Sequence, residues 1–222
     1  MIDVESVRHH LEALRGRLHA VGGDDVDIVA VTKTFGPDAI EAALAVGLDK
    51  IGENYAQELL AKREALSGAE VHFIGQLQSN KVRQLAGVVD VYETVDRAKL
   101  AREIAKRAPH SRVLVQVDTT GESGKGGCPL AELDALVDEI AALDLRLDGL
   151  MTVGPTEGGP AAAAPGFREV RAAVDRLGLA VCSMGMTDDL EVAVAEGSTQ
   201  IRVGTALFGR RPHVHDRDDL GR

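Results

Sequence analysis

A lysine stands where an apolar, β-branched stretch of the sequence should end. Residues 26–31 have the composition of a strand buried on both faces, and Thr32, Lys33 and Thr34 follow them. An amine at the end of a buried strand is partly desolvated, which lowers its pKa and leaves a fraction neutral, as attack on an aldehyde requires. Lys33 is therefore a candidate for Schiff-base formation. The alternative is an ordinary strand-end lysine that extends into water.

A glycine turn with hydroxyl and acidic residues occupies positions 183–189. Ser183, Met184 and Gly185 lead into it, and Thr187 precedes two aspartates. Backbone N–H groups at the start of a helix bind phosphate, which makes this turn a candidate phosphate site. The alternative is a plain helix cap, in which Thr187 caps the first turn and the acids complement the helix dipole.

A second candidate for the same phosphate follows the next apolar segment. Gly204 lets the backbone come close to a ligand, and Thr205 offers an amide and a hydroxyl. Arg202 points into the protein interior if Ile201 and Val203 face the surrounding helices. Because an arginine is rarely buried without a partner, this pattern favours an anion-binding site over simple packing.

These residues need elements that bring them together, and eight apolar segments predict eight β-strands. The segments cover residues 26–31, 50–52, 71–75, 88–94, 112–118, 145–153, 180–183 and 200–204. Helical patterns lie between them, and an amphipathic helix at about 2–20 leads the chain. The alternation predicts a single-domain (β/α)8 TIM barrel, with an open doubly wound sheet as the alternative. Residues 1–211 should form this domain, and the charged residues 212–222 should be a disordered tail.

A barrel gathers the carboxyl ends of its strands on one face, where enzymes of this fold place their sites. The polar and glycine-rich segments fall after strands, so we expect them on that face: Lys33, Glu53-Asn54, 76–81, 119–127, 151–152, 183–187 and 204–205. Two loops, 119–127 and 154–166, are rich in glycine or proline and are expected to be mobile. The first lacks the spacing of a nucleotide-binding phosphate loop.

Three further polar residues have less specific contexts. His72 lies within an apolar strand and is expected to be a hydrogen-bonded core residue. Glu53 and Lys81 belong to the predicted site face, where either a supporting salt bridge or a part in catalysis would explain them.

The composition excludes several classes of function. A formal net charge of −10 argues against sequence-independent binding to nucleic acid or to anionic lipid. Cys128 and Cys182 are far apart and have no metal-ligand spacing, so we expect no metal site and two free thiols in a reducing compartment. No signal peptide and no long apolar span is evident, and we therefore expect a cytoplasmic protein without a membrane segment.

Five stretches of the chain together resemble the pyridoxal phosphate homeostasis proteins. They are 32–34, 51–58, 72–81, 183–189 and 197–209. The resemblance implies a barrel similar to the N-terminal domain of alanine racemase that binds pyridoxal 5'-phosphate. It also implies a role for individual residues: Lys33 matches the Schiff-base lysine, Asn54 lines the cofactor pocket, Ser183, Gly204 and Thr205 match phosphate contacts, Met184 and Gly185 lie beside them, and Arg202 faces the pyridine nitrogen.

The implied function is storage or delivery of the cofactor, monomeric or weakly associated, with apoenzymes as partners and with effects on vitamin B6 and amino-acid balance. An arginine at the pyridine nitrogen cannot accept its proton, so the ring is a poor electron sink. Neither Tyr55 nor Tyr92 matches the second base of a racemase. A slow racemase or related enzyme is the alternative, and a cofactor-free barrel that acts through protein contacts is a third.

Overall fold

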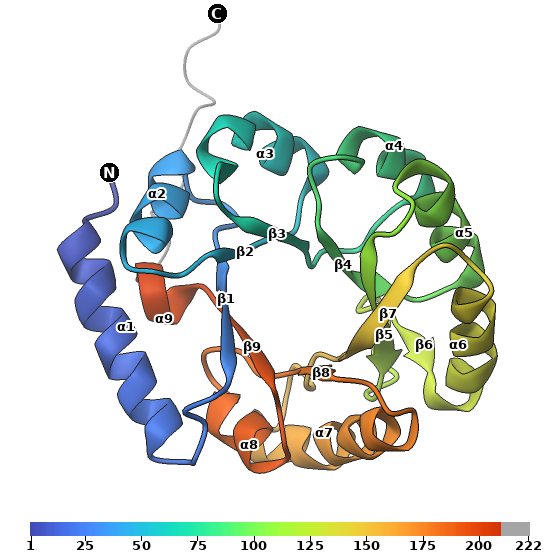
Figure 1. The fold of residues 1–222 in the computed structure, drawn as a ribbon. Coiled ribbons are helices and arrows are strands. Elements are labelled where there is room, and N and C mark those ends of the chain that lie inside the picture. The colour runs from blue at the N-terminus through green and yellow to red at the C-terminus, as the bar shows by residue number, and fades with distance from the viewer. Residues whose placement is uncertain (210–222) are drawn as a thin grey trace, which may run out of the picture.

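Residues 1–209 are described by a computed structural model, and in them eight parallel strands close into a barrel (Figure 1). Pairing runs through β1, β2, β3, β4, β5, β7, β8 and β9, and β9 pairs again with β1. The strands are β1 Asp27–Val31, β2 Lys50–Glu53, β3 Glu70–Phe73, β4 Val91–Val95, β5 Arg112–Asp118, β7 Arg146–Met151, β8 Val181–Ser183 and β9 Gln200–Val203. The predicted barrel is confirmed and the open sheet is wrong. The tail predicted at 212–222 lies outside the described residues.

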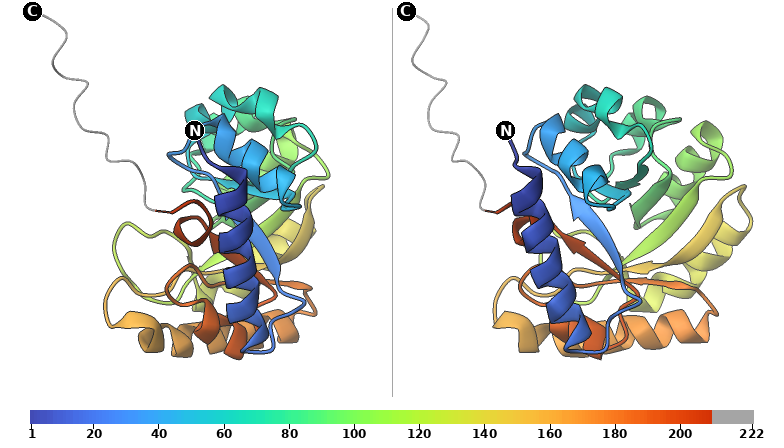
Figure 2. Two further views of the ribbon diagram at one scale, coloured as in Figure 1. Left: turned by 90° about the vertical axis from the view of Figure 1, so that its left-hand side faces the viewer. Right: turned by 60° about the vertical axis from the view of Figure 1, so that its left-hand side comes forward.

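Helices surround the barrel on its outside (Figure 1). They are α1 Val4–His19, α2 Pro37–Ala45, α3 Ala56–Ala61, α4 Val82–Leu85, α5 Ala98–Arg107, α6 Leu133–Ala141, α7 Gly159–Arg176, α8 Leu190–Ala195 and α9 Thr205–Phe208, with 3-10 turns η1 Arg63–Leu66, η2 Ser79–Lys81 and η3 Leu130–Glu132. The predicted leading helix is α1, which Asp3 caps through a bond from the Ser6 amide. It buries its apolar stripe and lies beside α9 at the other end of the described residues (Figure 2).

The helix α7 begins earlier than the sequence pattern indicates. The segment 154–166 is predicted as a loop, but α7 starts at Gly159 and continues through Pro165. Pro160 lies in the first turn, where a helix needs no amide donor, and the alanines after it are strong helix formers. Gly159 and Pro160 therefore mark the start of a helix and not an extended loop, whereas Pro165 and Gly166 lie within the helix.

Alternation along the strands separates an apolar outer layer from a polar barrel interior. In β9, Ile201 and Val203 belong to the apolar layer between strands and helices, so Gln200 and Arg202 face inward, as predicted for the arginine. Aliphatic side chains dominate barrel interiors as a rule. Here six buried polar residues come from inward positions instead: His72, Glu93, Gln116, Ser183, Gln200 and Arg202.

Candidate functional site

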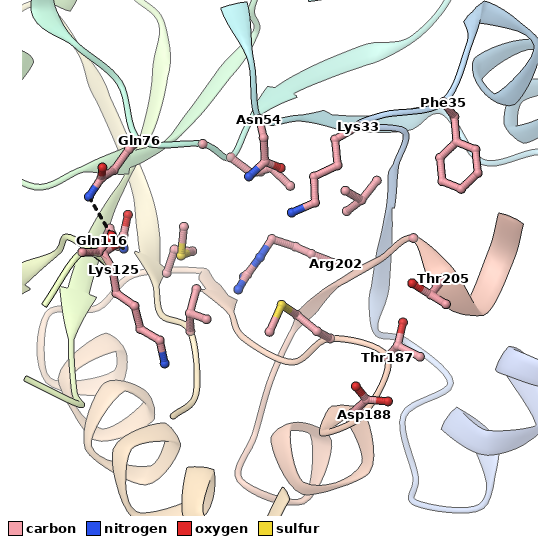
Figure 3. Close-up of a pocket in the computed structure, with 18 residues that line it drawn as sticks. Lys33, Phe35, Asn54, Gln76, Gln116, Lys125, Thr187, Asp188, Arg202 and Thr205 are labelled. Atoms are coloured by element: carbon pink, nitrogen blue, oxygen red, sulfur yellow. Dashed lines mark hydrogen bonds between the residues drawn. The ribbon is translucent and has the colours of Figure 1, made fainter. Parts of the chain in front are cut away.

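A pocket of about 460 Å³ opens at the carboxyl ends of the strands. Five of the residues expected in a site line it, although they come from distant parts of the chain: Lys33, Asn54, Arg202, Gly204 and Thr205. Figure 3 shows Lys33 and Arg202 extending into the same cavity. The closed barrel explains this convergence, because β1 and β9 are neighbours in the sheet.

A buried ion pair between Lys62 and Glu53 holds the backbone on the N-terminal side of Lys33. Lys62 is 5% exposed, and its Nζ donates to Glu53 Oε1 at 2.7 Å and to the Thr32 carbonyl oxygen at 2.8 Å. The Thr32 hydroxyl donates to the same carboxylate oxygen at 2.6 Å. Burial raises the pKa of Glu53, and the bonds from Lys62 and Thr32 oppose that shift. Glu53 therefore forms a supporting salt bridge, with Lys62 and not with Lys81 as its partner.

On the other side of Lys33 the chain turns sharply. Thr34 has a φ of 67°, a left-handed conformation that β-branched residues rarely adopt. Its amide donates to Glu58 Oε1 at 2.5 Å, and the same oxygen accepts from Lys62 at 2.5 Å. The Lys62 ammonium thus holds the residues on both sides of Lys33: Thr32 directly, and Thr34 through Glu58.

Arg202 is held by two hydrogen bonds within the barrel. The side chain is 5% exposed; Nη1 donates to the Ser183 hydroxyl at 2.6 Å and Nη2 to the Thr152 carbonyl oxygen at 2.7 Å. The Ser183 hydroxyl in turn donates to Glu93 Oε2 at 2.7 Å, and Gln200 Nε2 donates to Glu93 Oε1 at 2.9 Å. A carboxylate with no solvent exposure therefore lies behind the arginine and fixes its orientation.

His72 joins this network from the opposite side. Its Nδ1 lies 2.5 Å from Glu93 Oε1 and its Nε2 lies 2.8 Å from Glu70 Oε1, so both ring nitrogens donate to carboxylates. Burial lowers the pKa of His72, but the bonds to Glu70 and Glu93 outweigh burial and raise it to about 9. The same bond lowers the pKa of Glu70 to about 2. The prediction that His72 is a hydrogen-bonded core residue is confirmed, and the ring is an imidazolium at neutral pH.

The contacts extend into a series of alternating charges through the barrel. Its members in order are Arg146, Asp148, Arg112, Glu70, His72, Glu93, Ser183 and Arg202. Arg146 is 70% exposed at one end, whereas Arg202 lines the pocket at the other. The series therefore connects the opposite face of the barrel to the pocket.

The turn predicted to bind phosphate divides into two parts. Ser183, Met184 and Gly185 do not line the pocket: the serine hydroxyl belongs to the Glu93 network, and the Met184 amide donates to the Gln200 carbonyl oxygen. Met186, Thr187 and Asp188 line the pocket in their place.

The alternative of a helix cap by Thr187 is wrong. Helix α8 begins at Leu190, and the Thr187 hydroxyl accepts from the Ala206 amide at 3.3 Å, in the next β-α unit. The hydroxyl instead links the two strand ends that were predicted to share a phosphate.

The wall between these two strand ends offers backbone donors. Among the described residues, no acceptor receives a hydrogen bond from the amides of Thr187, Asp188, Gly204 or Thr205. A Cβ on Gly204 would lie 2.9 Å from the Val31 carbonyl oxygen, so only glycine fits there without a shift. These amides line a cavity that also contains two lysines and an arginine, which makes the wall suited to an anion.

The glycine-rich loop after β5 forms the opposite wall. The Lys125 ammonium donates to the Gly154 carbonyl oxygen at 2.6 Å, and Glu122 accepts from the Thr156 amide and hydroxyl at 2.9 and 2.6 Å. The two-residue strand β6, Cys128–Pro129, then pairs with the end of β5. The predicted mobility remains a prediction, but defined contacts join this loop to the segment before α7.

Among the lining residues to which sequence reasoning gave no individual role are Phe35, Gln76 and Lys125. Gln76 and Lys125 belong to segments expected on the site face, so their position after a strand was a usable signal. Phe35 carries no polar group, and only its position two residues after Lys33 could have indicated it.

The chain is similar to known proteins over nearly its whole length. Residues 2–212 match the family described as alanine racemase, N-terminal domain. A pyridoxal phosphate homeostasis protein from Pseudomonas aeruginosa is 39% identical over 220 residues, covering 94% of this chain and 96% of that protein. The chain belongs to the pyridoxal phosphate homeostasis protein family. This result confirms the resemblance carried by the five stretches.

Solved structures place this family member among proteins of the same fold. PipY of Synechococcus elongatus, solved with pyridoxal phosphate bound, is 32% identical, with a TM-score of 0.81 over 91% of this chain and all of that one. Alanine racemase from Clostridium difficile shares the fold at 17% identity, with a TM-score of 0.76 over 95% of this chain and 58% of that one.

Two features are absent from the described residues. No helix there is long and apolar enough to cross a membrane. No cluster of three or more histidine, cysteine, aspartate or glutamate side chains in residues 1–209 could hold a metal ion.

Proposed function

We propose that the pocket binds pyridoxal 5'-phosphate as a Schiff base with Lys33, and that the protein serves in homeostasis of this cofactor. The observation that carries the proposal is the meeting of Lys33, Arg202 and the Gly204-Thr205 amides in one cavity. The pyridoxal phosphate bound to PipY and the names of the relatives support it. Delivery to apoenzymes, and a monomeric state, belong to the same proposal.

The residues present fit this cofactor in charge and size. Lys33, Lys125 and Arg202 face the cavity with Asp188 as the acid among its lining residues, so a dianionic phosphate meets a cationic environment. A cavity of about 460 Å³ lies within the range of small-ligand pockets. When bound, the cofactor would supply an aldehyde and an electron-withdrawing ring.

Each group of the pocket then has a separate role in binding. The amides of Thr187, Asp188, Gly204 and Thr205 would hold the phosphate, which revises the contacts expected of Ser183, Met184 and Gly185. Ser183 and Gly185 would act indirectly, since the Ser183 hydroxyl accepts from Arg202 Nη1 at 2.6 Å and the Gly185 carbonyl oxygen accepts from the Arg202 amide at 3.0 Å. The Met184 amide bonds to the Gln200 carbonyl oxygen in the neighbouring strand. Asn54, which lines the pocket as expected, would contact the cofactor ring or its substituents.

Arg202 also makes the site poorly suited to racemisation. A guanidinium donates hydrogen bonds and accepts none, so it cannot take a proton from a ring nitrogen. Neither of the chain's two tyrosines lines the pocket, and Tyr92 has no solvent exposure. The site therefore favours retention of the cofactor over racemisation, which needs a strong electron sink and two bases.

The test compares the two lysines of the pocket. Purified protein loaded with pyridoxal phosphate should show a visible Schiff-base band, and borohydride reduction followed by peptide mass spectrometry should place the adduct on Lys33. Lys33→Ala should abolish band and adduct, whereas the matched variant Lys125→Ala should keep both. An adduct on Lys125, or a band that survives in Lys33→Ala, would contradict the assignment.

A further inference from the structure

A second pocket, of about 560 Å³, lies beside the first at the same end of the barrel. The segments after β2, β3 and β4 form it, and Asn54 and Gln76 line both pockets. Figure 3 shows these two residues together at one edge of the first pocket. The second pocket is therefore a neighbouring compartment that shares Asn54 and Gln76 with the proposed cofactor site.

The charges of this compartment are unbalanced. Arg97 pairs with Asp96 through Nη1 and donates through Nη2 to the Leu77 carbonyl oxygen at 2.9 Å. Lys81 also lines the pocket, and in the described part of the chain its ammonium has no hydrogen bond or ion pair. One positive charge thus stays uncompensated, on a protein whose formal net charge is −10.

Other lining groups suit a ligand with an apolar body. Phe73 and Leu77 are 1% and 4% exposed and form an apolar wall, and Tyr55 at the rim is 56% exposed. The side-chain amides of Gln57 and Gln78 also line the pocket, and neither makes a hydrogen bond within residues 1–209. An aromatic face, an apolar wall and uncommitted donors are typical of a small-molecule site.

Most residues of this compartment come from two stretches in which only Asn54 has a proposed role toward the cofactor. The stretches 51–58 and 72–81 carry the resemblance to the family, yet from them only Asn54 is assigned to the cofactor. Tyr55, Gln57, Gln78 and Lys81 all line the second pocket.

We propose that the second pocket binds a small organic carboxylate. The Lys81 ammonium and the Arg97 guanidinium would hold the carboxylate, and the apolar body would lie against Leu77 and Tyr55. A single uncompensated charge matches a monoanion, whereas a phosphate dianion would remain half neutralised and would be repelled by Asp96. The inference concerns a different cavity from the proposed cofactor site.

The test is an NMR titration of the full chain with benzoate and with benzamide, which have the same shape but differ in charge. Benzoate should shift the side-chain amide signals of Gln57 and Gln78, and benzamide should bind at least about tenfold more weakly. Lys81→Met should weaken benzoate binding by about the same factor. Lys106→Met, an exposed lysine on α5, should bind benzoate like the wild type.

Site-resolved signals keep the two pockets apart in this experiment. Benzoate shifts confined to Gly204 and Thr205, equal affinity in Lys81→Met, or Lys81-dependent binding of inorganic phosphate without benzoate binding would each overturn the proposal. Failure of the cofactor proposal would show separately. The wild-type protein mixed with pyridoxal phosphate would then lack the visible Schiff-base band, while benzoate would still shift the Gln57 and Gln78 signals.

Discussion

At the scale of single residues, charged groups lie buried behind the pocket. His72 lies between Glu70 and Glu93, and Arg112 holds Glu70 from the far side. A raised histidine pKa stabilises the folded state at pH values below the pKa in the unfolded chain, and this contribution is lost as pH rises through the folded value. For His72 that decline falls between pH 6.5 and about 9.

We predict that the stability of the wild-type protein falls by roughly 3 kcal/mol across this interval on account of His72, since each pKa unit corresponds to about 1.4 kcal/mol. His72→Gln cannot carry the charge, so its unfolding free energy should lack this component. Urea unfolding at pH 6.5 and at pH 9 measures the free energy of unfolding of both proteins. Equal pH dependence in the two would contradict the assigned imidazolium.

The same scale shows how far sequence reasoning reached into the site. Lys33, Arg202 and Gly204 were identifiable because each stands out against an apolar strand or in a glycine turn. The role of Ser183 was not, because its hydroxyl bonds to Glu93, 90 residues away in the sequence. A local pattern contains no information on such a partner.

At the scale of elements, the strands were predictable and the segments between them less so. A strand of a parallel barrel is covered by helices on its outer face and by the barrel interior on its inner face. Its residues are therefore mostly apolar, and sequence patterns detect such runs. The start of α7 was missed because proline and glycine indicate both a loop and a helix N-terminus. In the turns that the sequence pattern missed, Ala163 is 3% exposed, so packing of this part of α7 on the barrel favours the helix.

The loop 119–127 gives a prediction at this scale. Two hydrogen bonds from Thr156 to Glu122 join the loop to the segment before α7, and Lys125 makes an ion pair with Glu122 at 3.1 Å. Glu122→Ala should free the loop and speed cofactor release by about fivefold, a small effect because exposed hydrogen bonds and ion pairs each contribute little net stability. Stopped-flow absorbance with an excess of apoenzyme as a trap measures the rate. Glu132→Ala, an exposed residue beyond the loop, is the control, and an unchanged release rate in Glu122→Ala would show that the loop does not limit exit.

At the scale of the whole molecule, the two ends of the described chain support the pocket together. Strand β9 closes the barrel against β1, and α1 packs against α9 and α8 outside them (Figure 2). Arg17 of α1 donates to Glu191 at 2.6 Å and to the Thr187 carbonyl oxygen at 2.9 Å. The leading helix therefore holds a backbone segment that lines the pocket.

We predict that Arg17→Met raises the dissociation constant for pyridoxal phosphate by about threefold, with little change in Tm, because a partly exposed ion pair contributes modestly. Arg15→Met, an exposed position on the same helix, should leave the constant unchanged. Fluorescence titration and thermal unfolding of both variants distinguish the outcomes. A large loss of Tm in Arg17→Met would assign the residue to folding alone.

The alternating series from Arg146 to Arg202 also constrains how this protein can diverge. Removing one partner of a buried charge pair costs about 3–5 kcal/mol, a large part of the stability of a typical domain, whereas exchanging both partners together can be nearly neutral. Within the series, His72 and Glu93 are 1% and 0% exposed, so neither can be replaced alone at low cost. Descendants of this sequence should therefore keep the interior of the barrel unchanged or alter it in coupled pairs, while the exposed Arg146 varies freely.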